Sequence, residues 1–149
     1  MLVLNRLTTM RVPLALLVGL VLIFHSAAVA QELPIQEFKL GEHTLTVEIV
    51  STEAQRARGL MERESMAEYA GMLFVYPDHD HRCFWMQNTL IPLTLAFLSD
   101  DGLILQLVDM EPLSTQVHCS RAPVRYALEL NQGWFDRNDV ALGDQLQSF

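Results

Sequence analysis

From residue 36 onward, the sequence consists of short runs rich in apolar residues, and turn residues end each run before it reaches the length of a helix. In residues 44–50, Leu45, Val47 and Ile49 alternate with polar residues, which is the period of a strand with one buried face. Similar runs return at intervals of about ten residues, a spacing typical of β-sandwiches and β-barrels. The sequence therefore predicts a mostly β fold, with α+β character only at the margin.

The turn residues divide the chain into about seven short predicted strands and one or two short helices. The predicted strands are residues 36–40, 44–50, 71–75, 82–86, 93–98, 103–108 and 126–130, with one more short strand after residue 144. Thr52 and Gln55 form a capping-box pair that would begin a helix, which Gly59 would end. A second helical piece surrounds Trp134, and residues 111–123 have no period and are expected to form a loop. The sequence contains neither a linker nor an internal repeat, so we expect one barrel or sandwich domain.

Residues 1–30 have the organisation of a secretory signal peptide. Two arginines are their only charged side chains, and about eleven apolar residues follow at 14–24. The sequence Ala-Val-Ala at 28–30 supplies the small residues of a cleavage site, so we expect cleavage directly after it. Because a membrane-spanning helix needs about 20 apolar residues, an uncleaved anchor over residues 12–29 is the alternative. After cleavage we expect no stable membrane insertion and a protein that is periplasmic or secreted.

The remaining residues 31–149 are enough for a single core and too few for two domains. The full sequence carries 18 acidic and 10 basic residues, a net charge of −8 at pH 7, and loss of the two leader arginines would leave −10. An acid excess of this size disfavours nucleic acid and other anionic partners, because a nucleic-acid-binding protein needs a basic face. Two cysteines are too few for a disulfide-rich mini-protein or a four-thiolate zinc site.

Four segments carry a family resemblance. They are Arg58-Gly-Leu-Met61, Gly71-Met-Leu-Phe74, Phe84-Trp-Met-Gln-Asn-Thr89 with Ile91-Pro-Leu93, and Tyr126-Ala-Leu-Glu-Leu-Asn131 followed by Gly133 and Gly143-Asp144. Their order and spacing resemble the bacterial and archaeal family named domain of unknown function 192, over residues 45–146. The resemblance implies a small, mostly β, jelly-roll-like barrel that is often exported, and it implies no established reaction. Relatives usually carry Lys at the position of Gln87 and Asp at that of Thr94, so an acid–base pair formed by those positions would be absent here.

The segment around Trp85 is the richest in ligand-binding side chains. On a strand, Trp85 and Gln87 would point to one face, away from the core, and would line a concavity. The indole would then offer a flat apolar platform, and Gln87, Asn88 and Thr89 would supply hydrogen bonds, as in a site for a small polar ligand such as a sugar. Glu129 alternates with leucines and would point either to solvent or into the same cleft. In the alternative interpretation, Trp85 packs in the core and Asn88-Thr89 makes a turn.

A second cluster contains residue types found in metal sites. His79, His81 and Cys83 alternate, so they would share a face if the segment is extended, and imidazole with thiolate suits zinc or copper. The alternative is a solvated acidic loop without a metal. Cys83 and Cys119 are the only thiols, and an oxidising compartment would favour a disulfide between them. The sequence leaves open whether Cys83 is a metal ligand or a disulfide partner.

Together these features favour an exported binding protein without enzymatic activity, which would hold a small polar ligand or an envelope protein and would need no cofactor. The first alternative is a hydrolase that acts on envelope carbohydrate, with Glu129 or Asp109 as its acid. The second is a purely structural or interaction protein, and the third is a periplasmic metal binder. The sequence shows no Gly-rich phosphate loop and no Ser nucleophile elbow, and it leaves the question of catalysis open.

Overall fold

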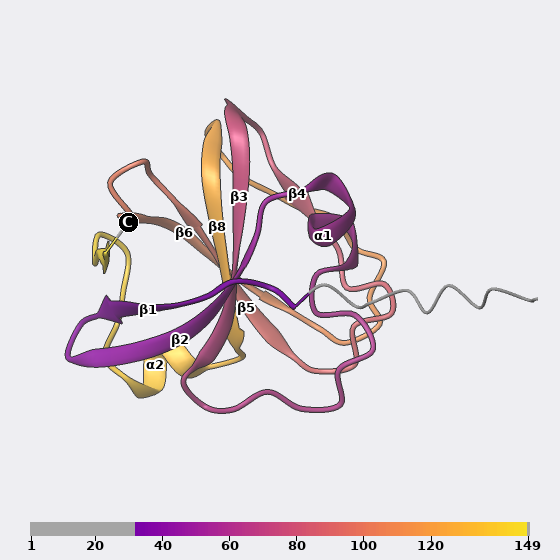
Figure 1. The fold of residues 1–149 in the computed structure, drawn as a ribbon, viewed down its shortest axis with the longest axis horizontal. Coiled ribbons are helices and arrows are strands. Elements are labelled where there is room, and N and C mark those ends of the chain that lie inside the picture. Colours follow the sequence, from indigo (N-terminus) through magenta and orange to yellow (C-terminus); the bar gives the residue numbers. More distant parts are fainter. Residues whose placement is uncertain (1–31, 149) are drawn as a thin grey trace, which may run out of the picture. The chain divides into compact units, whose positions relative to one another are not determined.

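Strands account for most of the secondary structure in residues 32–148, which are the residues described by a computed structural model of the chain (Figure 1). The elements in chain order are β1 (Ile35–Leu40), β2 (His43–Val50), α1 (Glu53–Arg58), β3 (Ala70–Asp80), β4 (Cys83–Phe84), β5 (Leu93–Leu98), β6 (Ile104–Met110), β7 (His118–Cys119), β8 (Val124–Asn131), α2 (Trp134–Arg137) and β9 (Leu146–Gln147). The predicted signal peptide, residues 1–30, lies outside this part of the chain. Within the described residues, no helix is long and apolar enough to cross a membrane.

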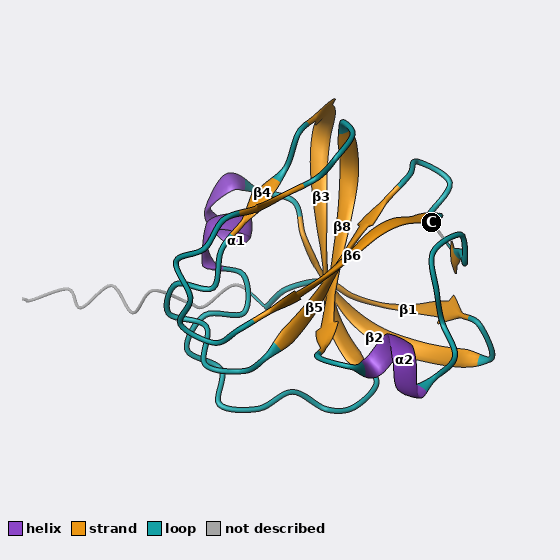
Figure 2. Ribbon diagram, turned by 180° about the vertical axis from the view of Figure 1, so that it is seen from behind, coloured by secondary structure: helices purple, strands orange, loops and turns teal. Residues whose placement is uncertain are grey.

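Seven strands form one curled, half-barrel sheet in the order β6-β5-β8-β3-β2-β1-β9, and β4 pairs with β7 in a separate two-stranded sheet (Figures 1 and 2). The neighbouring strands are antiparallel except for β2 and β3, which are parallel. The prediction of a mostly β fold with one or two short helices is therefore confirmed for residues 32–148. This part of the chain contains more strands than predicted, and three of them, β4, β7 and β9, are only two residues long.

Two predicted hairpins form as expected. A turn at Gly41 and Glu42 joins β1 to β2, and residues 99–103 join β5 to β6. In the second turn, the amide of Gly102 donates to the carbonyl of Ser99 over 3.0 Å, and Gly102 has a φ of 81°. Glycine adopts this left-handed conformation without steric cost, which explains why the Asp-Asp-Gly sequence ends one strand and begins the next.

A crossover that contains α1 connects β2 to β3 and makes these two strands parallel. The helix begins at the predicted capping box, in which the Gln55 amide donates to Thr52 Oγ1 over 3.2 Å and the Thr52 amide donates to Gln55 Oε1 over 3.1 Å. Gly59 follows the last helical residue, and its amide donates to the Gln55 carbonyl. The short helix is therefore fixed at both ends, and it lies beside β4 in both views (Figures 1 and 2).

The central strands β3, β5 and β8 separate two apolar clusters, because successive side chains on a strand point to opposite faces. In β8, Leu128 belongs to the first cluster, together with α2 and the β1–β2 hairpin, whereas Ala127 belongs to the second. All six residues of β5 are buried for the same reason. Glu129 lies on the face of β8 that is turned to the second cluster, and its partners in the register are Met72 of β3 and Leu95 of β5.

The close approach of β3 to β8 depends on Gly71. A Cβ atom at this position would lie 2.8 Å from the carbonyl oxygen of Glu129 and 2.4 Å from Cδ2 of Leu130. Both distances are too short for a real side chain in a packed core. Glycine thus allows the two strands to pair tightly beside Glu129.

The prediction that Pro77 would end the third strand is wrong. Instead, β3 continues to Asp80, and its pairing with β8 shifts register between Val75 and Asp80. Proline has no amide hydrogen to donate to a neighbouring strand, so it is accommodated where the ladder is interrupted. The irregular pairing carries the chain past Pro77 and leaves the residues on either side of it free to form the wall of a cavity.

The segments predicted as strand 82–86 and as loop 111–123 also differ from expectation. The first shrinks to the two residues of β4, and the second contains β7, which pairs with β4 so that Cys83 lies opposite Cys119. A disulfide joins these two residues. The covalent bond explains how strands of two residues, too short to persist by pairing alone, form a stable unit.

Hydrogen bonds join the two edges of the large sheet at one end. The Ile104 amide donates to the Asp144 carbonyl, and the Leu146 amide donates to the Gly102 carbonyl, both over 2.9 Å. Between these two hydrogen bonds, Leu103 forms an isolated antiparallel β-bridge with Gln145. The last described residues thus contact both β1 and the β5–β6 turn, which closes this end of the half-barrel.

We predict that reduction, or the double substitution of Cys83→Ala and Cys119→Ala, lowers the free energy of unfolding by about 4 kcal/mol. A bridge between residues 36 positions apart lowers the conformational entropy of the unfolded chain, and this loss destabilises the unfolded state by about the same free energy. Urea unfolding of the oxidised and reduced protein, followed by tryptophan fluorescence, measures the difference. Equal unfolding midpoints for the two forms would contradict the prediction.

Candidate functional site

A cavity of about 440 Å³ lies between α1, β3, β4 and β8. The helix and the residues after it contribute arginines and apolar side chains, and β3 contributes Phe74 and Tyr76. Cys83 and Phe84 come from β4, and Glu129 comes from β8. A volume of this size lies within the range of about 300–1,000 Å³ that is typical of small-molecule sites.

The structure brings three of the five predicted ligand-site residues together. Trp85, Thr89 and Glu129 all line this cavity, although Glu129 comes from a distant part of the sequence. Thr89 and Glu129 are each 5% exposed, whereas Trp85 is 49% exposed. The cavity thus combines two buried polar groups with an aromatic side chain that is half open to solvent.

The other two predicted residues, Gln87 and Asn88, are exposed and do not line the cavity. The expected alternation fails because this segment forms a turn, in which the Thr89 amide donates to the Met86 carbonyl over 3.0 Å and Asn88 has a φ of 60°. Asparagine tolerates this left-handed conformation better than most residues. The Asn88 carbonyl also accepts a hydrogen bond from the Glu62 amide over 2.8 Å. The turn at Asn88 therefore forms, while Trp85 stays out of the core.

Glu129 is the unusual residue of the cavity, because it is only 5% exposed and its carboxyl group has no hydrogen-bond partner among the described residues. It lies between Met72 and Leu95 in the sheet register, and its side chain forms no hydrogen bond or ion pair within residues 32–148. Burial raises the pKa of this carboxyl group to about 8, since removal from water penalises the charged form. At neutral pH the group is therefore mostly protonated, and it is able both to donate and to accept a hydrogen bond. A buried carboxyl with a shifted pKa in a cleft is typical of functional sites.

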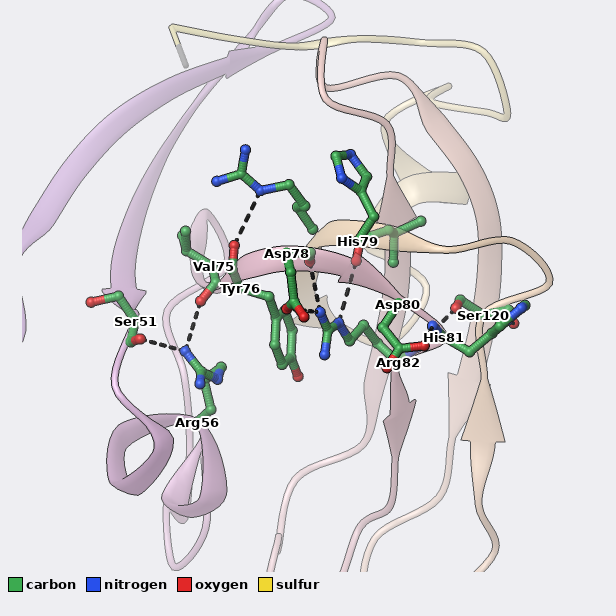
Figure 3. A network of polar contacts seen from close by, with 12 residues as sticks. Ser51, Arg56, Val75, Tyr76, Asp78, His79, Asp80, His81, Arg82 and Ser120 are labelled. Atoms are coloured by element: carbon green, nitrogen blue, oxygen red, sulfur yellow. Dashed lines mark hydrogen bonds and ion pairs between the residues drawn. The ribbon is translucent and has the colours of Figure 1, made fainter.

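Tyr76 lies between two arginines in the wall of the cavity (Figure 3). The guanidinium carbons of Arg56 and Arg82 lie 4.7 and 4.1 Å from the centre of its ring, close enough for attraction between a cation and the ring face. Nη1 of Arg56 donates to the Ser51 carbonyl and, over 2.9 Å, to the Val75 carbonyl. Burial raises the pKa of the Tyr76 hydroxyl more than the two arginines lower it, so the phenol stays protonated at neutral pH.

Arg82 fastens the irregular end of β3 to β8. Its Nη2 donates to the carbonyl oxygen and to Oδ1 of Asp78, each over 2.6 Å (Figure 3). Its Nε donates to the Val124 carbonyl over 3.3 Å. Hydrogen bonds of a charged donor are stronger than neutral ones. These contacts hold a guanidinium group in the cavity wall directly before the disulfide residue Cys83.

Sequence reasoning missed Arg56, Arg58, Arg82 and Tyr76, and it took the overall acid excess as a sign against anionic partners. The net charge is an average over the chain, whereas all three arginines line one cavity. One signal was present in the sequence, since Arg58 begins the first of the four family segments. Tyr76 gave no signal, because the strand that carries it was predicted to end there.

The predicted metal site at His79, His81 and Cys83 does not form in the described part of the chain. Cys83 is oxidised in the disulfide and has no thiolate to offer. Nε2 of His79 lies 2.8 and 2.9 Å from the carboxylate oxygens of Asp100, whereas Nδ1 of His81 lies 2.9 Å from the Ser120 carbonyl. The two imidazoles thus have different partners, and no group of three metal-ligand side chains is assembled within residues 32–148.

Asp109, the other acid considered for catalysis, belongs to a different part of the molecule. Its Oδ1 accepts a hydrogen bond from Thr94 Oγ1 over 2.6 Å, and Thr94 Oγ1 accepts one from the Gly133 amide over 3.2 Å. These residues line a smaller hollow of about 130 Å³. Of the two acids considered, Glu129 alone lies in the large cavity.

Comparison with known proteins gives the family. The sequence profile of DUF192, described as an uncharacterized ACR, matches residues 36–148. The chain belongs to the DUF192 family. A comparison with curated proteins finds no match.

Two solved structures are similar to this DUF192 chain. One is that of a candidate transcription regulator from Sinorhizobium meliloti 1021, with 36% sequence identity and a TM-score of 0.76, covering 78% of this chain and 95% of that chain. The other is a protein of unknown function from Novosphingobium aromaticivorans DSM 12444, with 28% identity and a TM-score of 0.75, covering 80% of this chain and 89% of that chain. The fold is therefore shared with these proteins.

All four segments that carry the DUF192 resemblance reach the cavity. The first contributes residues 58–61, the second contributes Phe74, the third contributes Trp85 and Thr89, and the fourth contributes Glu129. These segments are widely spaced in the sequence, and folding brings them to one place. This convergence makes the cavity the candidate functional site of the DUF192 chain.

We predict that wild-type protein loses stability as the pH rises toward and through about 8, and that Glu129→Gln removes this loss. The raised pKa means that the folded state holds the proton more tightly than the unfolded state, whose carboxyl titrates near the ordinary value of 4.5. The resulting stabilisation is complete below that value and is lost as the pH rises through the folded pKa, by about 1.4 kcal/mol per unit of pKa difference.

Free energies of unfolding at about pH 5 and about pH 8.5, measured for both proteins by urea titration, would test this prediction. The wild type should lose more stability than the variant over this interval. The same pH dependence in the two proteins would show that the carboxyl group is not held protonated by the fold.

Proposed function

We propose that the cavity binds a small polar ligand that has an apolar face and hydroxyl groups, as a sugar has, and that the protein acts as a binding protein. The observation that carries this proposal is the convergence of Trp85, Thr89 and Glu129 on one cavity of suitable size. Small-molecule sites typically combine an apolar surface with a few well-placed polar groups. The three residues supply both parts of that description.

Trp85 supplies the apolar part. The neighbouring aromatic residues Phe74 and Phe84 pack against each other with ring centres 5.0 Å apart, and both are buried, whereas Trp85 is 49% exposed. A sugar ring stacked on the indole would remove apolar area from water, worth about 25 cal/mol per Å². Because the indole is half exposed in the free protein, a ligand that covers it would gain this free energy on binding.

Thr89 and Glu129 supply the polar part. A hydroxyl group and a protonated carboxyl group each donate one hydrogen bond and also accept, which matches the hydroxyl groups of a sugar. The carboxyl group of Glu129 lines the cavity and has no hydrogen-bond partner among the described residues, so its oxygen atoms are available to a ligand. A ligand hydroxyl that paired with Glu129 would gain a hydrogen bond worth about 0.5–1.5 kcal/mol net.

A hydrolase that uses Glu129 as its general acid is a second candidate. The raised pKa of Glu129 favours it, because a general acid must hold its proton at the working pH. The other carboxyl groups that line the cavity are those of Glu53 and Asp78, and Asp78 is bound to Arg82. Release of reducing sugar from envelope polysaccharide by the wild type, and its loss in Glu129→Gln, would establish the hydrolase. No release by the wild type would count against the hydrolase.

We also propose that the protein works in the periplasm or is secreted. The disulfide between Cys83 and Cys119 supports this location, since disulfides persist in oxidising compartments, and so does the predicted signal peptide. A nucleic-acid partner, which the description of the Sinorhizobium protein would suggest, is disfavoured by the net charge of −8.

We predict that Trp85→Ala weakens ligand binding at least about tenfold, because the stacking surface is lost. The probes are glucose, galactose and N-acetylglucosamine, each with its acidic derivatives, and isothermal titration calorimetry measures the affinities. Leu90→Ala is the matched control, because Leu90 is 45% exposed and lies in the same loop but does not line the cavity. Unchanged affinity in Trp85→Ala, or a wild type that binds none of the probes saturably, would overturn the proposed function.

A further inference from the structure

We propose that the ligand of this cavity carries an acidic group, a carboxylate or a phosphate, which the cavity arginines recognise. The inference rests on the proposed function and names its ligand class, a hydroxylated ring with an acidic substituent. Arg56, Arg58 and Arg82 line the same cavity as Trp85 and Glu129. A guanidinium group presents its donors in a planar fork that matches the oxygen atoms of either acidic group.

Two of these arginines are anchored by the protein and still keep donors for a ligand. Arg56 uses Nη1 for two backbone carbonyls, and Arg82 uses Nε and Nη2 for Asp78 and the Val124 carbonyl. Within residues 32–148, Nε and Nη2 of Arg56 and Nη1 of Arg82 have no protein acceptor. The site therefore offers unused charged donors next to its apolar and hydroxyl-binding parts.

The anchoring also lowers the entropic cost of binding. The ring of Tyr76 lies between the two guanidinium groups (Figure 3), and backbone carbonyls fix the ends of both side chains. Immobilising a free arginine on binding costs about 0.5–1.5 kcal/mol. Because Arg56 and Arg82 are ordered by contacts inside the protein, an acidic ligand meets donors that already have their positions.

The local charge balance favours an acidic ligand even though the chain as a whole is acidic. The carboxyl groups of the lining belong to Glu53, Asp78 and Glu129. Asp78 is paired with Arg82 at 2.6 Å, and Glu129 is mostly protonated at neutral pH because burial raises its pKa. Among the lining residues this leaves the charge of Glu53 against the charges of Arg56 and Arg58, and the partner of Arg58, Glu62, lies outside the lining.

Arg58 offers the cleanest variant, because the fold does not depend on it. Its side chain is 71% exposed and pairs with Glu62 over 3.1 Å at the surface, a contact of small energetic value. Arg137 is the matched control. Its side chain is 52% exposed, it pairs with Glu68 over 3.0 Å, and it does not line the cavity. Substitution of either arginine by glutamine changes the net charge equally.

Isothermal titration calorimetry of the full chain or its processed form with glucose, glucuronate and glucose 6-phosphate tests the inference. These probes share one ring and differ in the acidic group. We expect at least one acidic probe to bind about tenfold more tightly than glucose, with an affinity that falls as salt is added. The preferred probe then distinguishes a carboxylate from a phosphate. Arg58→Gln should lower the affinity for that probe about tenfold more than the affinity for glucose, whereas Arg137→Gln should change the affinity for neither probe.

The outcomes separate this inference from the proposed function. Saturable binding with equal affinity for all three probes overturns the inference and leaves the sugar-binding proposal standing. An equal loss of affinity in Arg58→Gln and Arg137→Gln also overturns it, because the effect would then come from net charge. The absence of saturable binding by every probe overturns both proposals.

Discussion

The position of β8 between β3 and β5, with apolar clusters on both faces of the sheet, is the constraint on which the cavity depends. A strand buried on both faces has no exposed side to which a polar residue can turn. Glu129 is therefore fixed between Met72 and Leu95, and the group relieves the cost of burial by keeping its proton. Regular sheet pairing thus holds the mostly protonated carboxyl group of Glu129 in the wall of the cavity.

The other walls of the cavity are irregular, and polar or covalent contacts take the place of strand pairing in them. The capping box fixes the short helix α1, Arg82 fastens the bulged end of β3 to β8, and the Cys83–Cys119 disulfide holds β4 against β7. Each contact joins segments that would otherwise have few backbone partners. The molecule therefore divides into a regular sheet that supplies Glu129 and an irregular rim that supplies Trp85 and the arginines.

Local chemistry explains what the sequence predicts well. The hairpins and the helix start follow from alternation, from Gly102 and from the capping box, which act within a few residues. The cavity depends on contacts between distant segments, so alternation left Glu129 with two orientations and could not choose between them. Gln87 and Asn88 were placed in the site because a strand was assumed where a turn forms, and Tyr76 was missed because Pro77 was expected to end its strand.

Charge shows why an average over the chain is a poor guide to a binding site. At physiological ionic strength, interactions between exposed charges are screened over about 8 Å, so the many surface acids contribute little inside a cavity. Arg56 and Arg82, held within 5 Å of the Tyr76 ring centre, would act on the proposed ligand at contact distance, where each charge counts for more. The acid excess then acts mainly on the rate at which an anionic ligand arrives. Affinity is decided by the few groups that touch a ligand, and in the site that we propose those groups are arginines, an exposed indole and a carboxyl group that burial keeps mostly protonated at neutral pH.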